Sequence, residues 1–401
     1  MAAQHEKALV PQIRFTGFTD PWEQRKLGEV ASGFEYGLNA AASDFDGEKK
    51  YLRITDIDDQ TREFRTDDLS SPDINNPIDD RYLLKEGDIL FARTGASVGK
   101  TYLYKASDGK TYYAGFLIRA HVSDEADAGF IFQSTLTERY KQFVLLTSQR
   151  SGQPGINAQE YSDLLLPLPS LMEQRRIGAF FDRLDSLITL HQRKYDKLCV
   201  LKKSMLDKMF PKGGSLYPEI RFAGFTDPWE QRKLGEVASG FEYGLNAAAS
   251  DFDGEKKYLR ITDIDDQTRE FRTDDLSSPD INNPIDDRYL LKEGDILFAR
   301  TGASVGKTYL YKASDGKTYY AGFLIRAHVS DEADAGFIFQ STLTERYKQF
   351  VLLTSQRSGQ PGINAQEYSD LLLPLPSLME QRRIGAFFDR LDSLITLHQR
   401  K

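Results

Sequence analysis

Residues 171–210 have the sequence LMEQRRIGAFFDRLDSLITLHQRKYDKLCVLKKSMLDKMF, which contains no proline and a single glycine. Its apolar residues recur at alternating steps of four and three, the heptad pattern of a helix that packs against another helix. A helix of about 39 residues is roughly 58 Å long at 1.5 Å per residue, which suits a spacer. Two polar residues, His191 and Lys202, interrupt the seam and are expected to set its register or to lie at its edge. The apolar seam positions are Ile177, Phe181, Leu184, Ile188, Tyr195, Leu198, Met205 and Met209.

The beginning of this stretch recurs at residues 378–401, and the match extends far upstream. Residues 218–401 repeat residues 11–194 at an offset of 207, with differences only at Gln12/Glu219 and Thr16/Ala223. A repeat of this length is a whole domain plus a connector. The chain therefore contains one unit twice, and we expect two near-identical ligand sites. The seam of the second copy consists of Ile384, Phe388, Leu391 and Ile395.

The second helix stops at Lys401, at a point where the first continues with YDKLCVLKKSMLDKMF. If the two helices pack antiparallel, the apolar stripe around Ile177 to Leu184 has no counterpart to cover it. We therefore expect the N-terminal tail or a second protein to cover this stripe.

Upstream of each long helix, the heptad repeat gives way to short apolar runs separated by turn residues. Short apolar runs such as YLRITDI, GDILFAR, KTYLYKA and YYAGFLIRAHV predict the strands of a mixed sheet. FIFQSTLTERYKQFVLLTSQ predicts one helix, and the prolines of LLLPLPS predict an extended segment. The expected fold class is α+β, with two mixed-sheet domains related by internal two-fold pseudo-symmetry and separated by long helices that form a coiled coil. The expected boundaries are 11–170 and 218–377 for the domains, 171–217 for the first helix and linker, and 378–401 for the second helix.

The composition is that of a globular protein, with 40% apolar and 28% charged residues. No apolar run approaches a membrane span, and MAAQHEKALV lacks the features of a secretory signal, so we expect a cytoplasmic protein without a membrane partner. The single cysteine, Cys199, has no disulfide partner in the chain. A formal net charge of −8 predicts weak non-specific binding to nucleic acid, with partner subunits supplying positive charge.

Two glycine-rich loops carry side chains suited to a polyanion. FARTGASVGKTYLY is one residue too short for a phosphate-binding P-loop, and it presents Arg93, Thr94, Ser97 and Lys100. SQRSGQPGIN presents Arg150, Ser151, Gln153 and Asn157, and Arg, Gln and Asn side chains recognise guanine and adenine edges. FEYGLNA and GKTYYAG add Tyr36, Asn39, Lys110 and Tyr112.

The second copy repeats this set of candidate DNA-binding residues. It comprises Tyr243, Asn246, Arg300, Thr301, Ser304, Lys307, Lys317, Tyr319, Arg357, Ser358, Gln360 and Asn364. An ordinary polar surface for the loops and a packing role for the tyrosines remain open at this point.

Signatures of enzymes are absent from the sequence. It contains no H-E-x-x-H, no G-x-S-x-G and no complete P-loop, and its five histidines leave little for acid–base chemistry. Paired acidic residues such as Asp58-Asp59 lie in segments whose sequence is typical of turns. A metal-dependent nuclease site formed by carboxylates far apart in sequence remains an open possibility at this point. We therefore expect no catalytic residue, no metal site and no cofactor on this chain.

Several of these motifs, taken in order, resemble one known family. KEGDILFARTGASVGK (85–100), GINAQEYSDLLLPLPSLMEQRRIGAFFDRLDSLI (155–188) and the repeat opening PEIRFAGFTDPWEQRKLGEV (218–237) are similar to the specificity subunit of type I restriction-modification enzymes, HsdS. The resemblance covers essentially the whole chain. It implies two target-recognition domains held apart by antiparallel helices on which modification subunits dock.

The resemblance also implies partners and their cofactors. Double-stranded DNA is the expected ligand, two modification subunits bring S-adenosylmethionine for adenine N6 methylation, and a motor-nuclease restriction subunit brings ATP and Mg. Family members typically carry two different target domains, whereas the two domains here are identical, so the expected target is an interrupted palindrome. The alternative is a bivalent protein–protein scaffold that does not bind DNA, which would fit the acidic charge balance.

Overall fold

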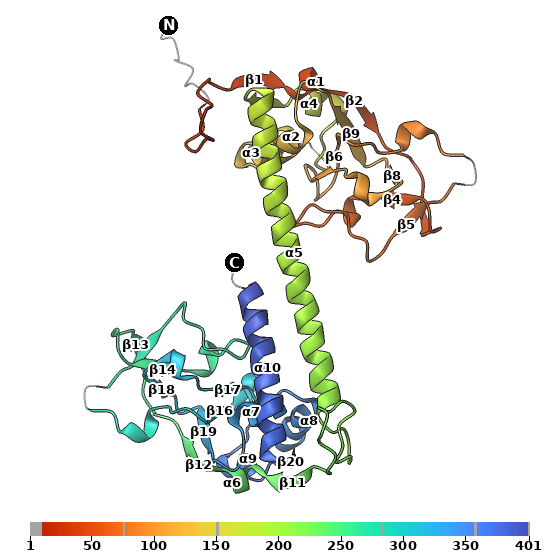
Figure 1. Cartoon of the computed structure of the whole chain (residues 1–401). Coiled ribbons are helices and arrows are strands. Elements are labelled where there is room, and N and C mark those ends of the chain that lie inside the picture. Colours follow the sequence, from red (N-terminus) through yellow and green to blue (C-terminus); the bar gives the residue numbers. More distant parts are fainter. Residues whose placement is uncertain (1–9, 75–76, 150–151, 282–283, 357–358, 400–401) are drawn as a thin grey trace. The chain divides into compact units, whose positions relative to one another are not determined.

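The computed structural model describes residues 10–74, 77–149, 152–281, 284–356 and 359–399 (Figure 1). The chain divides into two compact units, Met1–Leu190 (unit 1) and His191–Lys401 (unit 2). Their boundary lies inside one helix, α5 (Leu171–Met209), so the segment expected as a separate spacer is shared between the units. None of the helices in the described ranges is long and apolar enough to cross a membrane.

The two units contain the same strands and α-helices in the same order, and unit 2 contains in addition the C-terminal half of α5. In unit 1 these are β1 (Glu23–Lys26), α1 (Leu27–Val30), β2 (Ala31–Tyr36), β3 (Ala42–Asp44), β4 (Lys50–Leu52), β5 (Ser70–Pro72), β6 (Asp88–Ala92), β7 (Thr101–Leu103), β8 (Thr111–Tyr113), β9 (Leu117–Val122), α2 (Ala128–Ser134), α3 (Glu138–Thr147), α4 (Ala158–Ser162), β10 (Leu165–Leu168) and the start of α5. In unit 2 they are β11 (Glu230–Lys233), α6 (Leu234–Val237), β12 (Ala238–Tyr243), β13 (Ala249–Asp251), β14 (Lys257–Leu259), β15 (Ser277–Pro279), β16 (Asp295–Ala299), β17 (Thr308–Leu310), β18 (Thr318–Tyr320), β19 (Leu324–Val329), α7 (Ala335–Ser341), α8 (Glu345–Thr354), α9 (Ala365–Ser369), β20 (Leu372–Leu375) and α10 (Leu378–Gln399).

The largest sheet of each unit has four antiparallel strands, in the order β2-β9-β6-β7 in unit 1. Strand β6, with the sequence DILFA, is buried along its whole length because both faces of the sheet are covered. Ile89 and Phe91 pack into one apolar cluster, and Leu90 and Ala92 pack into another on the opposite face. A separate pair, β4 and β8, is parallel, so each unit has the mixed strand pairing that the sequence predicts.

The helical segment that follows β9 differs from the prediction of one continuous helix. The structure divides it into α2 and α3, and Thr135 and Thr137 lie at the break. The Thr135 hydroxyl is 2.7 Å from that of buried Thr101, and the Thr137 hydroxyl caps α3 by accepting a hydrogen bond from the Tyr140 N–H at 3.4 Å. Side-chain hydrogen bonds of this kind compete with helix continuation, which explains the interruption.

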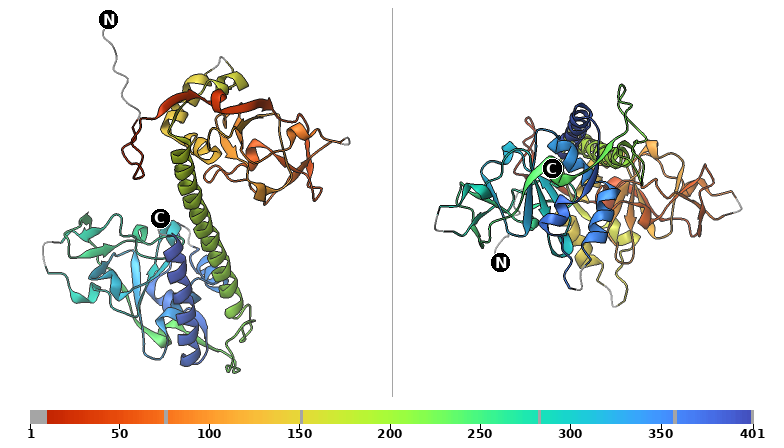
Figure 2. Two further views of the ribbon diagram at one scale, coloured as in Figure 1. Left: turned by 45° about the horizontal axis from the view of Figure 1, so that its top comes forward. Right: turned by 90° about the horizontal axis from the view of Figure 1, so that it is seen from below.

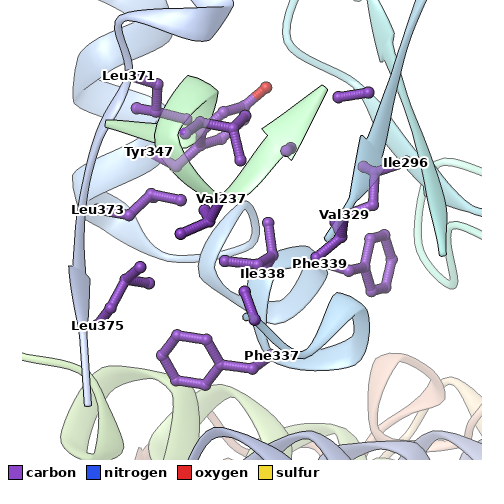
Figure 3. Packing of buried hydrophobic residues seen from close by; sticks show 14 of the residues in the cluster. Val237, Ile296, Val329, Phe337, Ile338, Phe339, Tyr347, Leu371, Leu373 and Leu375 are labelled. Carbon is purple, nitrogen blue, oxygen red and sulfur yellow. The ribbon is translucent and has the colours of Figure 1, made fainter. Parts of the chain in front are cut away.

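Unit 2 contains the helix packing that the heptad seam predicts. Its apolar cluster lies between the strands, α7 and β20, where Phe337, Ile338, Leu373 and Leu375 gather (Figure 3). Helix α10 lies beside the C-terminal half of α5 in this unit (Figure 2). The direction is antiparallel, because His191 near the start of this half contacts His398 at the end of α10 (2.9 Å between their Nδ1 atoms) and Lys202 pairs with Asp392 (2.6 Å).

Candidate nucleic-acid interface

The two glycine-rich loops singled out in the sequence lie side by side in each unit. In unit 1 the Gly95 N–H donates to the Pro154 carbonyl at 3.0 Å, and the Ile156 N–H donates to the Arg93 carbonyl at 2.9 Å. Unit 2 has the corresponding bonds, from Gly302 to Pro361 (3.0 Å) and from Ile363 to Arg300 (2.9 Å). Two segments that are about 60 residues apart in sequence therefore form one surface.

The loop at residues 93–100 leaves buried strand β6 and returns tightly. The Gly99 N–H donates to the Ala92 carbonyl at 2.9 Å, and Gly99 has a left-handed φ of 83°. A Cβ at Gly99 would lie 2.5 Å from the Val144 side chain of α3, so only glycine fits there. The loop is thus fixed by the core below it and holds its side chains in a defined position.

Arg93 is the central side chain of this surface. Its guanidinium carbon lies 4.8 Å from the centre of the Tyr36 ring, and its Nη1 donates to the Gly115 carbonyl at 3.4 Å. The Arg93 N–H also donates to the carbonyl of Phe116, whose side chain is 63% exposed. In unit 2 the recess at this place has a volume of about 660 Å³, and Tyr243, Asn246, Arg300 and Phe323 are among the residues that line it.

The aromatic stacking holds the arginine fork in one orientation, because a cation is attracted to the face of the ring. A guanidinium has five N–H donors in a fixed plane, and among the described residues the Arg93 side chain donates through Nη1 alone. This arrangement suits a planar acceptor edge or a phosphate.

Gln153 and Asn157 contribute amides from the second loop. Gln153 is exposed, and its Nε2 would lie 3.1 Å from a Cβ at Gly95, so the two loops approach closely here. Asn157 caps α4: its Oδ1 accepts from the Glu160 N–H at 2.9 Å, while Glu160 accepts from the Asn157 N–H at 2.8 Å. The Asn157 side chain is therefore held by its oxygen, and its amide NH₂ takes no part in this cap. Gln360 and Asn364 have the same positions in unit 2.

The structure removes two pairs of predicted contacts from the surface. Lys100 is 7% exposed, and its Nζ donates to the carbonyls of Ile54 and Ile57 and pairs with Asp59 at 2.7 Å, which lowers the pKa of that carboxyl. Lys307 is buried in the same way in unit 2. These lysines tie a loop to the core, since a buried ammonium must be satisfied by oxygen partners. Tyr112 and Tyr319 are 3% exposed and pack in the core.

The remaining predicted residues have mixed positions. Tyr36, Asn39, Tyr243 and Asn246 border the surface and are exposed. Lys110 and Lys317 are exposed but are paired with Glu48 and Glu255 at 2.8 and 2.7 Å, and this hydrogen bond raises the pKa of each lysine. Thr94, Ser97, Thr301 and Ser304 are half-buried within the first loop. Arg150, Ser151, Arg357 and Ser358 lie outside the described residues.

The predicted helix seam differs between the two units. In unit 2, Met209, Ile384, Phe388, Leu391 and Ile395 are buried, and Tyr195, Leu198 and Met205 pack against them. In unit 1, Phe181, Leu184 and Ile188 are 37%, 40% and 55% exposed, and Ile177 is half-buried. The stripe that the sequence leaves without a helical counterpart is therefore open in the described part of unit 1.

Phe116 and Phe323 were missed in the sequence, where they stand in the apolar run YYAGFLIRAHV and resemble core residues of a strand. A turn at Gly115–Phe116, closed by the Leu117 N–H donating to the Ala114 carbonyl at 2.9 Å, separates β8 from β9 and turns the phenyl ring outward. The glycine in this run was the available signal. Among the described residues, no group of three or more His, Cys, Asp or Glu side chains could hold a metal ion.

Comparison with known proteins agrees with this architecture. The model of the type I restriction modification DNA specificity domain matches residues 19–199 and again residues 226–401. The specificity subunit of the type I restriction enzyme MjaVIII from Methanocaldococcus jannaschii is 23% identical over 80% of this chain and 75% of its own length. The EcoKI specificity subunit of Escherichia coli K12 is also 23% identical, over 67% of this chain and 60% of its own length.

A solved structure supports the fold. The S subunit of the type I restriction-modification system from M. genitalium has a TM-score of 0.61 to this chain at 14% identity, with 98% of this chain and 94% of that one covered. The two domain matches together span most of the sequence and coincide with the two copies of the repeat. The chain belongs to the specificity subunits of type I restriction-modification systems and carries the family's domain twice.

Proposed function

We propose that each unit reads a short DNA half-site through the surface formed by its two glycine-rich loops. The observation that carries this proposal is the fixed cluster of Arg93, Tyr36 and exposed Phe116, which recurs in unit 2 as Arg300, Tyr243 and Phe323. Arginine paired with guanine in the major groove is the commonest specific protein–DNA contact, and Gln and Asn serve adenine in the same way. Gln153 and Asn157 supply such amides next to the arginine.

The target that follows is an interrupted palindrome. The interface residues are identical in the two units, so both units select the same half-site. Duplex DNA presents two identical half-sites to a two-fold related reader when the second is inverted. A gap that neither unit reads separates the two half-sites.

The chemistry belongs to partner subunits under this proposal. Two modification subunits dock on the helical part of this chain, where Leu187, Leu190 and Val200 of α5 are 48%, 61% and 70% exposed. They bring S-adenosylmethionine and methylate an adenine at N6 after rotating it out of the duplex. A restriction subunit adds ATP- and Mg-dependent translocation and cleavage. The net charge of −8 assigns much of the phosphate neutralisation to these partners.

The test is selection of bound sequences from a pool of random duplexes by the complex of this chain with a modification subunit. Arg93→Ala should relax one base pair in one half-site, Arg300→Ala should relax its counterpart in the other, and the double variant should relax both. The loss at that base pair should be about 1–3 kcal/mol. Lys110→Ala is the control, because loss of a phosphate contact should weaken all sequences alike and reduce the salt dependence by about one ion.

The outcome also separates the proposal from the scaffold alternative. Retention of every base preference by the Arg93→Ala, Arg300→Ala double variant would remove these loops from the readout. Binding that does not weaken as salt rises would favour a protein–protein scaffold, since phosphate contacts release counterions and are strongly salt-dependent.

A further inference from the structure

Unit 1 has an apolar groove between α2, β10 and the first turns of α5. Its volume is about 480 Å³, and its walls include Trp22, Phe130, Leu136, Leu166, Ile177 and Phe181. The groove continues toward Leu184 and Ile188, which are 40% and 55% exposed on α5. Exposed apolar side chains that gather in this way mark a surface for a partner.

The same place in unit 2 is filled. Phe210, which follows α5, stacks on Phe337 with 5.3 Å between the ring centres and contacts Trp229 and Phe388 at 6.0 and 6.1 Å. Met209 and Phe210 are 3% and 5% exposed. The C-terminal half of α5 thus closes the groove of unit 2.

The walls of the two grooves have identical sequences, so their exposure measures what lies against them. Phe181 is 37% exposed while Phe388 is fully buried, and Ile188 is 55% exposed while Ile395 is 7% exposed. Trp22 is half-buried, whereas Trp229 is 1% exposed. The difference follows the contacts of residues 195–211, because this segment packs on unit 2 and has no counterpart on unit 1 in the described residues.

The described part of the N-terminal segment does not take this place. Arg14 forms two hydrogen bonds of 2.7 Å with the buried Glu173 carboxylate, and Phe15 packs edge-on against Phe180 at 5.8 Å. Arg221 and Phe222 make the corresponding contacts with Glu380 and Phe387 in unit 2, where the α5 segment is also present. The two segments therefore occupy different sites. Residues 1–9, part of the N-terminal tail considered in the sequence, lie outside the described residues.

A charged group in unit 1 also matches the α5 segment that packs on unit 2. In unit 2, Asp392 accepts from Gln340 at 2.9 Å and pairs with Lys202 of α5 at 2.6 Å. The equivalent Asp185 accepts from Gln133 at 2.7 Å, and no lysine or arginine within the described ranges pairs with it. The groove thus offers one carboxylate to a basic residue in addition to its apolar surface.

We propose that the groove of unit 1 binds, in trans, a helix with the sequence character of residues 195–213, carried by a separate polypeptide. The helix places methionine and phenylalanine in the pocket formed by Trp22, Phe130 and Phe181, and its lysine pairs with Asp185. An added polypeptide with such a helix gives unit 1 the closed groove that unit 2 has within its own chain. Binding of this helix concerns assembly and does not depend on DNA reading.

The experiment uses the full chain and a fluorescein-labelled synthetic peptide of residues 195–213. Anisotropy should show saturable binding of one peptide per chain, and the Trp22 emission should shift to shorter wavelength as the indole loses water. The peptide contains no tryptophan, and Trp229 is already buried, so the shift reports on unit 1. A peptide with Met209→Asp and Phe210→Asp should not bind, since both side chains enter the apolar pocket.

Variants of the chain locate the site. Phe181→Asp should weaken peptide binding at least about tenfold. Met172→Asp, at a position of the same helix that is outside the groove and 74% exposed, should leave peptide binding unchanged. The proposal is overturned if no peptide binds at millimolar concentration or if Phe181→Asp binds as tightly as the parent chain. It is also overturned if the chain self-associates through this groove and the peptide does not dissociate the dimer.

Discussion

Replacement of one phenylalanine in each copy of the repeat measures how the two units differ in packing. Phe388 is fully buried and lies against Phe210, whereas Phe181 has the same sequence neighbours and is 37% exposed. Phe388→Ala removes a buried ring and leaves a cavity, which costs about 3–5 kcal/mol. Phe181→Ala removes a ring whose burial is incomplete, and water fills the space left behind.

Phe181→Ala should lower the free energy of unfolding by only about 1–2 kcal/mol. The Phe181 ring is about one third exposed and so gains less from burial, and no empty cavity remains when the ring is removed. The losses of unfolding free energy caused by the two substitutions should thus differ by about 2–3 kcal/mol. For units of this size, about 1 kcal/mol shifts the melting temperature by 2–4 °C, so the expected difference is roughly 4–12 °C.

Each unit contains one tryptophan, which allows the two unfolding transitions to be followed separately. Trp229→Phe leaves Trp22 as the probe of unit 1, and Trp22→Phe leaves Trp229 as the probe of unit 2. Each alanine variant is compared with its own single-tryptophan parent in urea, since a chain of two units does not unfold in one step. Equal losses of unfolding free energy, or a larger loss for Phe181→Ala, would refute the assignment of the extra burial to α5.

Three further changes test the roles assigned above. Lys100→Met should destabilise unit 1 by about 1–3 kcal/mol in urea unfolding, because the carbonyls of Ile54 and Ile57 lose their hydrogen-bond donor. The variant should leave base preference unchanged. Altered base preference in a fully folded variant would show that Lys100 contacts DNA. Burial, Lys194 and His191 lower the pKa of His398, so the folded state binds a proton at His398 less readily than the unfolded state. The stability present above the usual histidine pKa range is therefore lost as the pH falls through that range. His398→Gln should show a smaller fall in melting temperature between pH 7.5 and 5.5 than the parent chain, and an equal fall would contradict this. Gln153→Ala should relax base selection beside the position relaxed by Arg93→Ala, and unchanged selection would exclude its amide from readout.

Much of the fold could be predicted from periodicity alone. The heptad seam predicts α5, and the offset of 207 predicts that both units share one order of elements, as they do. The antiparallel packing of α5 and α10, which the family resemblance implies, is present in unit 2. These features depend on patterns that extend over many residues, so single exceptions did not obscure them.

The errors came from single side chains whose role is decided by tertiary contacts. Lys100 stands in a glycine-rich loop, and its residue type predicts contact with a polyanion. In the structure its aliphatic chain is buried, and its ammonium group donates hydrogen bonds to carbonyls that are about 45 residues away in sequence. Thr135 and Thr137 were compatible with a helix by spacing, but their hydroxyl bonds divide it. No local pattern records these partners.

The candidate interface is only partly predictable from the sequence, because it also depends on tertiary contacts. The residue types of Arg93, Gln153 and Asn157 predict base contacts, and the structure places their two loops together through the bond from Gly95 to Pro154. The sequence could not show that Tyr36 orients Arg93 or that Tyr112 faces the core, because both depend on which side of a short strand each residue occupies.

The most direct test of the central claim is mapping of N6-methyladenine across the genome of a host that expresses this chain with a cognate modification subunit. Two identical reading units predict one interrupted palindrome, methylated on both strands, whose halves are the same short sequence inverted. A two-part target with unlike halves would contradict the account, as would the absence of new methylation from a stable complex of the two proteins.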